Sequence, residues 1–220
     1  MNLKTIIIVV SIILGVVGFL VLTEPKETQT SEPSNHTTGA GTTGVTLTEF
    51  GDFQCPGCAS YYPVVKQVKE EYGDKITFRF VHFPLESIHP NARAAARAAE
   101  AASRQGKFWE MHDQLFEYQS QWQDTNDPIT TFKSYAVNLG LDEAQFETDY
   151  KDSAISAIVS ADLKRGREKG VSSTPTFMLN DEVINPAGGL EAFRTIIDQK
   201  IEELTGQKAD RNSTEDQTTE

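Results

Sequence analysis

The sequence contains very little cysteine: Cys55 and Cys58 are the only two among 220 residues. It has neither a second Cys-x-x-Cys pair nor a His-x-x-x-His pair. Two thiolates supply half of a tetrahedral zinc site, so a structural zinc site of the usual four-ligand kind is excluded. A disulfide between cysteines three positions apart closes a small ring, which removes little loop entropy. A purely structural disulfide is therefore a poor explanation of the pair.

Positively charged residues are also scarce relative to negatively charged ones. The chain has 20 lysines and arginines against 32 aspartates and glutamates, which gives a formal net charge of −12. Nucleic acids and anionic lipid surfaces attract proteins with a positive surface. The composition therefore argues against either of them as a partner.

Charged residues are absent from the segment 5–22, which reads TIIIVVSIILGVVGFLVL. As a helix this segment is about 27 Å long, close to the thickness of a bilayer core. The apolar region of a cleaved signal peptide is usually about 7–15 residues long and ends at a small-residue site, which Thr23-Glu24-Pro25 does not match. We predict a retained membrane anchor over 1–22. Lys4 precedes the apolar run 5–22, so the positive-inside rule predicts a single-pass protein of the cell membrane with its catalytic domain outside the cytoplasm.

Valine, isoleucine, leucine and aromatic residues are absent from 23–44. Such a stretch cannot bury enough apolar surface to offset its ordering entropy, so we predict a flexible linker there. The polar segment 205–220 is predicted to be a disordered tail for the same reason. The residues between them, 45–204, are enough for one domain with a hydrophobic core.

Within this domain, hydrophobic periodicity predicts an α/β fold. A strand over 45–50, a helix from Pro56 to Gly73 and a strand over 75–83 form a βαβ unit with a parallel strand pair. A helical insertion over about 88–170 follows the second strand. After it the sequence predicts a strand over 176–179, a hairpin to Val183 and Ile184, and a closing helix over 190–204.

The two cysteines lie at the junction between the first predicted strand and the first predicted helix. Cys55 is placed at the N-cap, Pro56 at the first helical position and Cys58 one turn further on. Unpaired amides and the helix dipole stabilise a thiolate there, and cysteine pKa values in such settings fall to about 3.5–7.5. We expect Cys55 to be an exposed nucleophile and Cys58 a buried partner that resolves mixed disulfides.

Two other functions stay open on the residues alone. His82 could join Cys55 and Cys58 in a copper(I) site, because thiolate and imidazole suit that ion. The chain would then be a membrane-tethered copper-binding or metal-delivery protein. An adhesive or scaffolding domain that keeps a relict disulfide is the third possibility.

Several short motifs resemble one known family. Cys-Pro-Gly-Cys opens the first helix and Ser-Thr-Pro-Thr-Phe, 173–177, opens the third predicted strand. Together with His-Phe-Pro-Leu at 82–85 and the run from His89 to His112, they resemble the DsbA-like branch of the thioredoxin fold. The resemblance covers about 45–204. A Cys-x-x-Cys motif alone is a moderate signal, whereas the combination in this order of elements is a strong one.

The resemblance implies a thioredoxin-like α/β fold with a helical insertion, and it implies roles for single residues. Pro175 would be cis and face the cysteines, with the trans isomer of an ordinary turn as the alternative. The backbone of Thr174 would then pair with a substrate chain as an added strand. Glu49, six residues before Cys55, would be a buried acid that takes a proton from Cys58. An exposed strand carboxylate is the alternative for Glu49.

The function implied is a thiol–disulfide oxidoreductase that forms or exchanges disulfides in secreted proteins through Cys55 and Cys58. Its partners would be reduced or unfolded protein substrates and a membrane redox partner, such as a quinone reductase, that reoxidises it. The chemistry needs no cofactor, and no dimerisation domain is visible, so a monomer is expected. The dipeptide between the cysteines is Pro56-Gly57, where the best-known oxidising relatives have Pro-His. Gly57 cannot donate to the thiolate, so we expect a milder oxidant.

Overall fold

The computed structural model describes residues 31–211. The predicted anchor over 1–22, the first part of the predicted linker and the last part of the predicted tail lie outside the described residues. Within 31–211, no helix combines the length and the apolar character that crossing a membrane requires.

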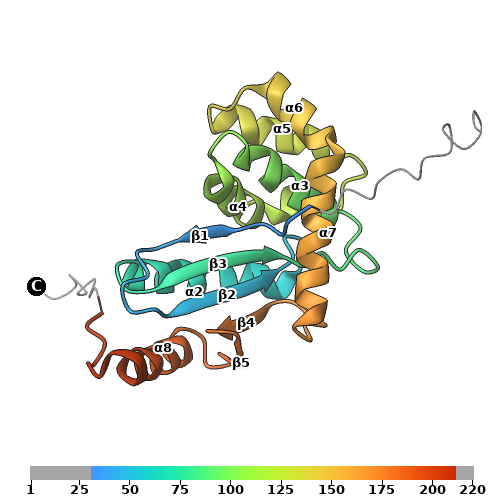
Figure 1. Cartoon of the computed structure of the whole chain (residues 1–220). Coiled ribbons are helices and arrows are strands. Elements are labelled where there is room, and N and C mark those ends of the chain that lie inside the picture. Colours follow the sequence, from blue (N-terminus) through green and yellow to red (C-terminus); the bar gives the residue numbers. More distant parts are fainter. Residues whose placement is uncertain (1–30, 212–220) are drawn as a thin grey trace, which may run out of the picture. The chain divides into compact units, whose positions relative to one another are not determined.

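The core element is a mixed five-stranded sheet with the strand order β1-β3-β2-β4-β5 (Figure 1). Strands β2 and β3 run parallel, while the other neighbouring pairs run antiparallel. The helix between β2 and β3 completes the predicted βαβ unit. The strands are β1 (His36–Thr38), β2 (Thr46–Gly51), β3 (Thr77–His82), β4 (Thr176–Leu179) and β5 (Glu182–Ile184).

Seven α-helices lie in the described residues, and five of them, α3 to α7, form an insertion between β3 and β4. The alanine-rich sequence of α3 favours a helix and offers small side chains, and α3 packs against α4, α5, α6 and α7. The predicted fold class, α/β with this helical insertion, is confirmed. The helices are α2 (Pro56–Tyr72), α3 (Ala92–Ser103), α4 (Phe108–Glu117), α5 (Pro128–Asn138), α6 (Glu143–Lys151), α7 (Ser153–Glu168) and α8 (Leu190–Thr205).

The two faces of the sheet are covered by different helices, with α7 in front and α2 behind in Figure 1. Side chains alternate between the faces along each strand. Leu47 and Phe177 belong to the large core that includes α2 and α8, whereas Phe50 and Met178 pack in a smaller cluster with Leu163 of α7. This alternation decides which strand residues lie beneath the first turn of α2.

The described part of the predicted linker is not a free tether. Strand β1 pairs antiparallel with β3, with His36 opposite Phe80. The amide and hydroxyl of Ser34 both donate to the buried carboxylate of Asp162, at 2.8 and 2.5 Å. The prediction of a flexible linker over 23–44 is therefore wrong from Ser34 onward. Its polar residues are ordered because backbone pairing at a sheet edge and buried carboxylates satisfy them, with no need for an apolar pattern.

Candidate active site

The turn between β2 and α2 places the cysteine pair. Cys55 is the N-cap of α2 and Pro56 follows at the first helical position, as predicted. The carboxylate of Asp52 accepts hydrogen bonds from the Gln54 amide at 2.8 Å and from the Leu85 amide at 2.9 Å. Asp52 thus fastens this turn to the segment that follows β3. The sequence analysis missed this role, although an aspartate directly after a strand and before a helix was the available signal.

Both cysteines are free thiols in this structure, and both are buried. Cys58 is fully covered, as expected from its position one turn into the helix. Cys55 was expected to be exposed, and this is wrong, since only 7% of its surface is accessible. The cause is a loop that approaches from far along the chain: the Cys55 Sγ lies 3.3 Å from the carbonyl oxygen of Thr174.

The two thiols differ strongly in acidity. The pKa of Cys55 is lowered to about 5, first by the hydrogen bond from Cys58. Burial opposes this shift, while the Thr174 side chain and the amides of Gly57 and Cys58 add to it. Burial, the hydrogen bond to Cys55 and the nearby Glu49 carboxylate raise the pKa of Cys58 well above its ordinary value. At neutral pH the pair therefore holds one thiolate, on Cys55, beside one thiol.

The Thr174–Pro175 peptide bond is cis, and both residues lie half-buried beside the cysteines. Gly57 faces this loop so closely that an added Cβ would lie 3.1 Å from Cδ of Pro175 and 3.5 Å from the Cys55 Sγ. The structure thus brings together four predicted residues: the two cysteines, Thr174 and Pro175. A side chain at position 57 would have to fit between the proline and the thiolate.

Glu49 lies beneath α2 and is 3% exposed, which excludes the alternative of an exposed strand carboxylate. In the sheet it stands between Phe80 of β3 and Phe177 of β4, on the face that carries the large core. Burial raises the pKa of Glu49 to about 8, with the Lys69 charge acting against this and the Cys55 charge adding to it. A carboxyl with this pKa exchanges its proton near neutral pH.

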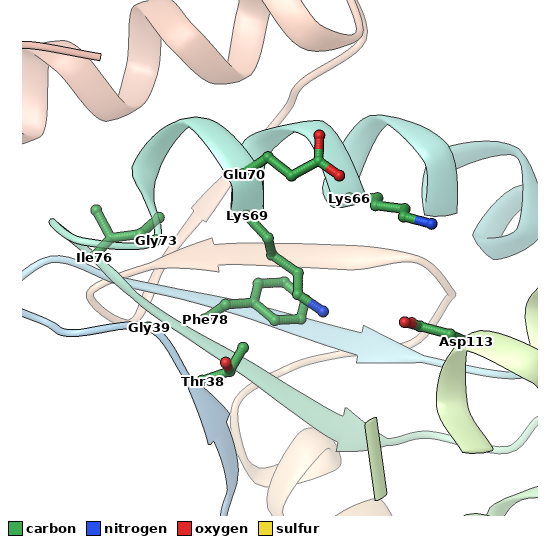
Figure 2. A pocket seen from close by; sticks show the side chains of 9 residues that line it. All are labelled: Thr38, Gly39, Lys66, Lys69, Glu70, Gly73, Ile76, Phe78 and Asp113. Carbon is green, nitrogen blue, oxygen red and sulfur yellow. The ribbon is translucent and has the colours of Figure 1, made fainter. Parts of the chain in front are cut away.

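Lys69 was missed by the sequence analysis. It follows Val65 by four positions and so shares the buried side of α2, where a lysine is unusual. Its ammonium lies 5.3 Å from the ring centre of Phe78 and 4.3 Å from that of Trp109. Figure 2 shows the side chain extending across Phe78 with its nitrogen directed towards Asp113. Burial lowers the pKa of Lys69, and its positive charge acts on Glu49.

Lys69, Phe78 and Asp113 border a pocket of about 400 Å³ between α2, β3 and α4 (Figure 2). Lys66, Lys69, Phe78 and Asp113 are among its lining residues, and neither cysteine is. The pocket therefore borders the lysine that acts on Glu49, and it lies towards the opposite end of α2 from the cysteines.

The predicted copper ligands do not come together. The Nε2 atom of His82 lies 2.8 Å from the Oε1 atom of Glu100, on α3. Among residues 31–211, the one group of three side chains spaced to hold a metal ion is His36, His82 and Glu100, without either cysteine. The described residues thus give no support to a copper site that uses Cys55 and Cys58.

Comparisons with known proteins agree with the thioredoxin-like fold. The thioredoxin family matches residues 31–199. A probable disulfide bond formation protein D of Bacillus anthracis is 28% identical over 206 residues, which cover 88% of this chain and 92% of that protein. The crystal structure of BdbD from Bacillus subtilis in its oxidised form superposes with a TM-score of 0.68 at 22% identity, covering 79% of this chain and 97% of that one.

A Na(+)/H(+) antiporter NhaA 1 of Mycolicibacterium gilvum is 37% identical over 150 residues. The match covers 66% of this chain and 23% of the antiporter. This chain therefore spans about a quarter of the length of the first curated relatives that it matches.

Proposed function

The chain belongs to the thioredoxin family, and on this basis we propose that it is a thiol–disulfide oxidoreductase that works through Cys55 and Cys58. One observation carries the proposal: a thiol with its pKa near 5, at the N-terminus of a helix, contacts a fully buried thiol whose pKa is raised. The Cys55 thiolate is suited to act as a nucleophile and as a leaving group, and Cys58 is suited to resolve a mixed disulfide.

In the oxidising direction, a substrate thiolate attacks the Sγ atom of Cys55 in the Cys55–Cys58 disulfide. The S–S bond breaks and Cys58 leaves as a thiolate, which takes up a proton because its pKa is high. A second substrate thiolate then attacks the substrate sulfur of the mixed disulfide and displaces Cys55. Two electrons pass to the pair, and the stable Cys55 thiolate is a good leaving group.

We assign to Glu49 the transfer of a proton to and from Cys58. It is buried beneath α2, and its pKa of about 8 lets it give a proton to the departing Cys58 thiolate and take one back in reverse. Thr174 is assigned to substrate binding, since its backbone lies beside Cys55 and can pair with an extended chain.

We further propose that substrates are reduced secreted proteins and that the chain acts as a monomer held at the outer side of a membrane by residues 1–22. A membrane redox partner would reoxidise it. The charge-free run at 5–22 supports this placement, and the name of the Bacillus anthracis relative, a probable disulfide bond formation protein, supports the action on disulfides. Gly57 leaves the thiolate without a histidine donor, so we expect a milder oxidant than the Pro-His enzymes.

Refolding of reduced, unfolded ribonuclease by the purified oxidised chain, with glutathione disulfide present to reoxidise the Cys55–Cys58 pair, tests the function. Recovery of ribonuclease activity is expected to be catalysed, to be lost in Cys55→Ser and to be insensitive to a chelator. Cys58→Ser keeps the attacking thiolate without its resolving partner, so it should accumulate a mixed disulfide with glutathione disulfide. Full activity in Cys55→Ser would overturn the proposal.

A further inference from the structure

Away from the cysteine pair, two histidines and a glutamate converge from three elements. The Nε2 atoms of His36, on β1, and His82, on β3, lie 2.6 and 2.8 Å from the same Oε1 atom of Glu100, on α3. One ligand atom from each residue lies within 4.8 Å of the others. Two imidazole nitrogens and a carboxylate oxygen form a donor set that suits zinc.

The packing around this cluster holds the three side chains in place. The side chains of His82 and Glu100 are 1% and 5% exposed, and that of His36 is 13% exposed. The His36 ring stacks on Phe108, with ring centres 3.5 Å apart and planes inclined by 7°. The site is therefore buried on the side of β3 and α3, and it opens to solvent at His36.

The local charge also points to a cation. Asp162, which is fully buried, accepts hydrogen bonds from the amide and hydroxyl of Ser34 and from the amide of His82, all of them neutral donors. In the described chain, Glu100 pairs with His36 and His82 alone, and neither Glu100 nor Asp162 forms an ion pair with a lysine or arginine. Two buried carboxylates thus flank His82, one at its backbone and one at its ring. Buried negative charge of this kind is normally balanced by a partner charge or a metal ion.

We propose that His36, His82 and Glu100 bind a divalent metal ion, with zinc as the favoured ion. Three protein ligands would leave a fourth position for water on the open side, at His36. The ion would replace the Nε2 protons of the two histidines. In the absence of the ion, the Nε2 atom of His82 donates to the Glu100 carboxylate. With the ion bound, the ring proton of His82 would lie on Nδ1, which has no hydrogen-bond partner among the described residues. Because its ligands come from β1, β3 and α3, the ion would clamp β1 to the rest of the domain.

Metal binding by the full chain without a histidine tag tests this proposal. Both cysteines are replaced, Cys55→Ser and Cys58→Ser, to remove thiolates that would themselves take zinc. After equilibrium dialysis against zinc chloride and gel filtration, metal analysis should find about one zinc per chain, the stoichiometry of a single site. His36→Gln and Glu100→Gln should each lose this zinc.

His89→Gln is the matched control, since the Nδ1 atom of His89 faces only one carboxylate oxygen, of Asp52, at 2.7 Å. It should keep the zinc. Thermal unfolding provides a second readout: zinc should raise the melting temperature of the Cys-free chain and of His89→Gln but not that of His36→Gln, whose partly exposed site tolerates substitution. Retention of zinc by His36→Gln and Glu100→Gln, or no zinc in the Cys-free chain, would overturn the proposal.

Discussion

The Sγ atom of Cys55 and the carbonyl oxygen of Thr174 lie 3.3 Å apart, although 119 positions separate them in the sequence. This contact joins the N-terminus of α2 to the cis-proline loop, and it buries a cysteine that the helix alone would leave accessible. The reactivity of the thiol is therefore set jointly by the helix and by the loop.

The first prediction concerns the pH dependence of Cys55. Because the pKa of this thiol is lowered to about 5, the thiolate should persist at neutral pH and be lost only as the pH falls through 5. The rate of alkylation by iodoacetamide should accordingly rise with a midpoint near pH 5, against about 8.5 for free cysteine. Cys55→Ser should leave almost no fast reaction, since Cys58 is buried and protonated. A midpoint above pH 8 would contradict the assignment.

The second prediction concerns Thr174. Its buried hydroxyl has no hydrogen-bond partner among the described residues, so it is available to donate to the Cys55 thiolate, whose pKa it lowers. Thr174→Val should therefore raise that pKa by about one to two units, as expected for one hydrogen bond to a charged group. The midpoint of the alkylation profile measures the shift. Ser173→Ala is the matched control, because Ser173 is exposed and should leave the midpoint unchanged. Equal midpoints in Thr174→Val and the parent chain would show that the Thr174 hydroxyl does not lower the pKa of Cys55.

The third prediction follows from the raised pKa of Glu49. Between its unfolded value, near about 4.3, and the folded value of about 8, only the unfolded state loses the proton as the pH rises. Glu49 should therefore reduce the stability of the fold across this window, by about 5 kcal/mol in total. Denaturant unfolding from pH 5 to 8.5 should show this loss in the parent chain relative to Glu49→Gln.

Comparing the two chains cancels the contribution of Cys55, which has the opposite sign. The exposed Glu70, also on α2, provides the control: Glu70→Gln should follow the parent chain at every pH. A constant difference in stability between Glu49→Gln and the parent over the whole range would show that Glu49 is not protonated in the fold.

The fourth prediction concerns the lysine that acts on Glu49. The charge of Lys69 lowers the pKa of Glu49, so its removal in Lys69→Met should raise that pKa, by about one unit if the two charges interact by about 1.4 kcal/mol. A carbon-13 titration of the Glu49 carboxyl measures this directly. Lys66→Met is the control, since Lys66 lines the same pocket but pairs with Glu117 at 3.5 Å. Equal shifts in both variants would argue against a specific effect of Lys69.

The fifth prediction tests where the domain begins. A chain that starts at Val45 lacks Ser34 and leaves the buried Asp162 carboxylate without two of its three donors. Its free energy of unfolding should fall by at least about 3 kcal/mol relative to a chain that starts at Ser31, because unsatisfied buried charges are costly. Denaturant unfolding of the two chains makes the comparison, and equal stabilities would restore the view of 34–44 as a linker.

Local sequence patterns were sufficient to predict much of this structure. The strand–helix–strand order and the placement of Cys55 and Pro56 at the start of α2 follow from periodicity and capping, which act over a few residues. The burial of Glu49 and the cis bond at Pro175 came from the family resemblance instead. Periodicity alone would have left an ordinary strand carboxylate and a trans proline.

What the sequence did not reveal depends on contacts between distant segments. The covering of Cys55 depends on the Thr174 loop, and the influence of Lys69 on Glu49 depends on how α2 lies over the sheet. Strand β1 is polar and three residues long, so no hydrophobic pattern marks it. The grouping of His36 with Glu100 depends on that strand, and it was hidden for the same reason.

Strand β1 also determines which border of the sheet is open to other molecules. It occupies the outer side of β3, a six-residue strand whose outward-facing amides and carbonyls would otherwise be unpaired. At the far border stands β5, which is only three residues long and offers little to pair with. A chain that loses its first strand should therefore associate with copies of itself as well as unfold more easily.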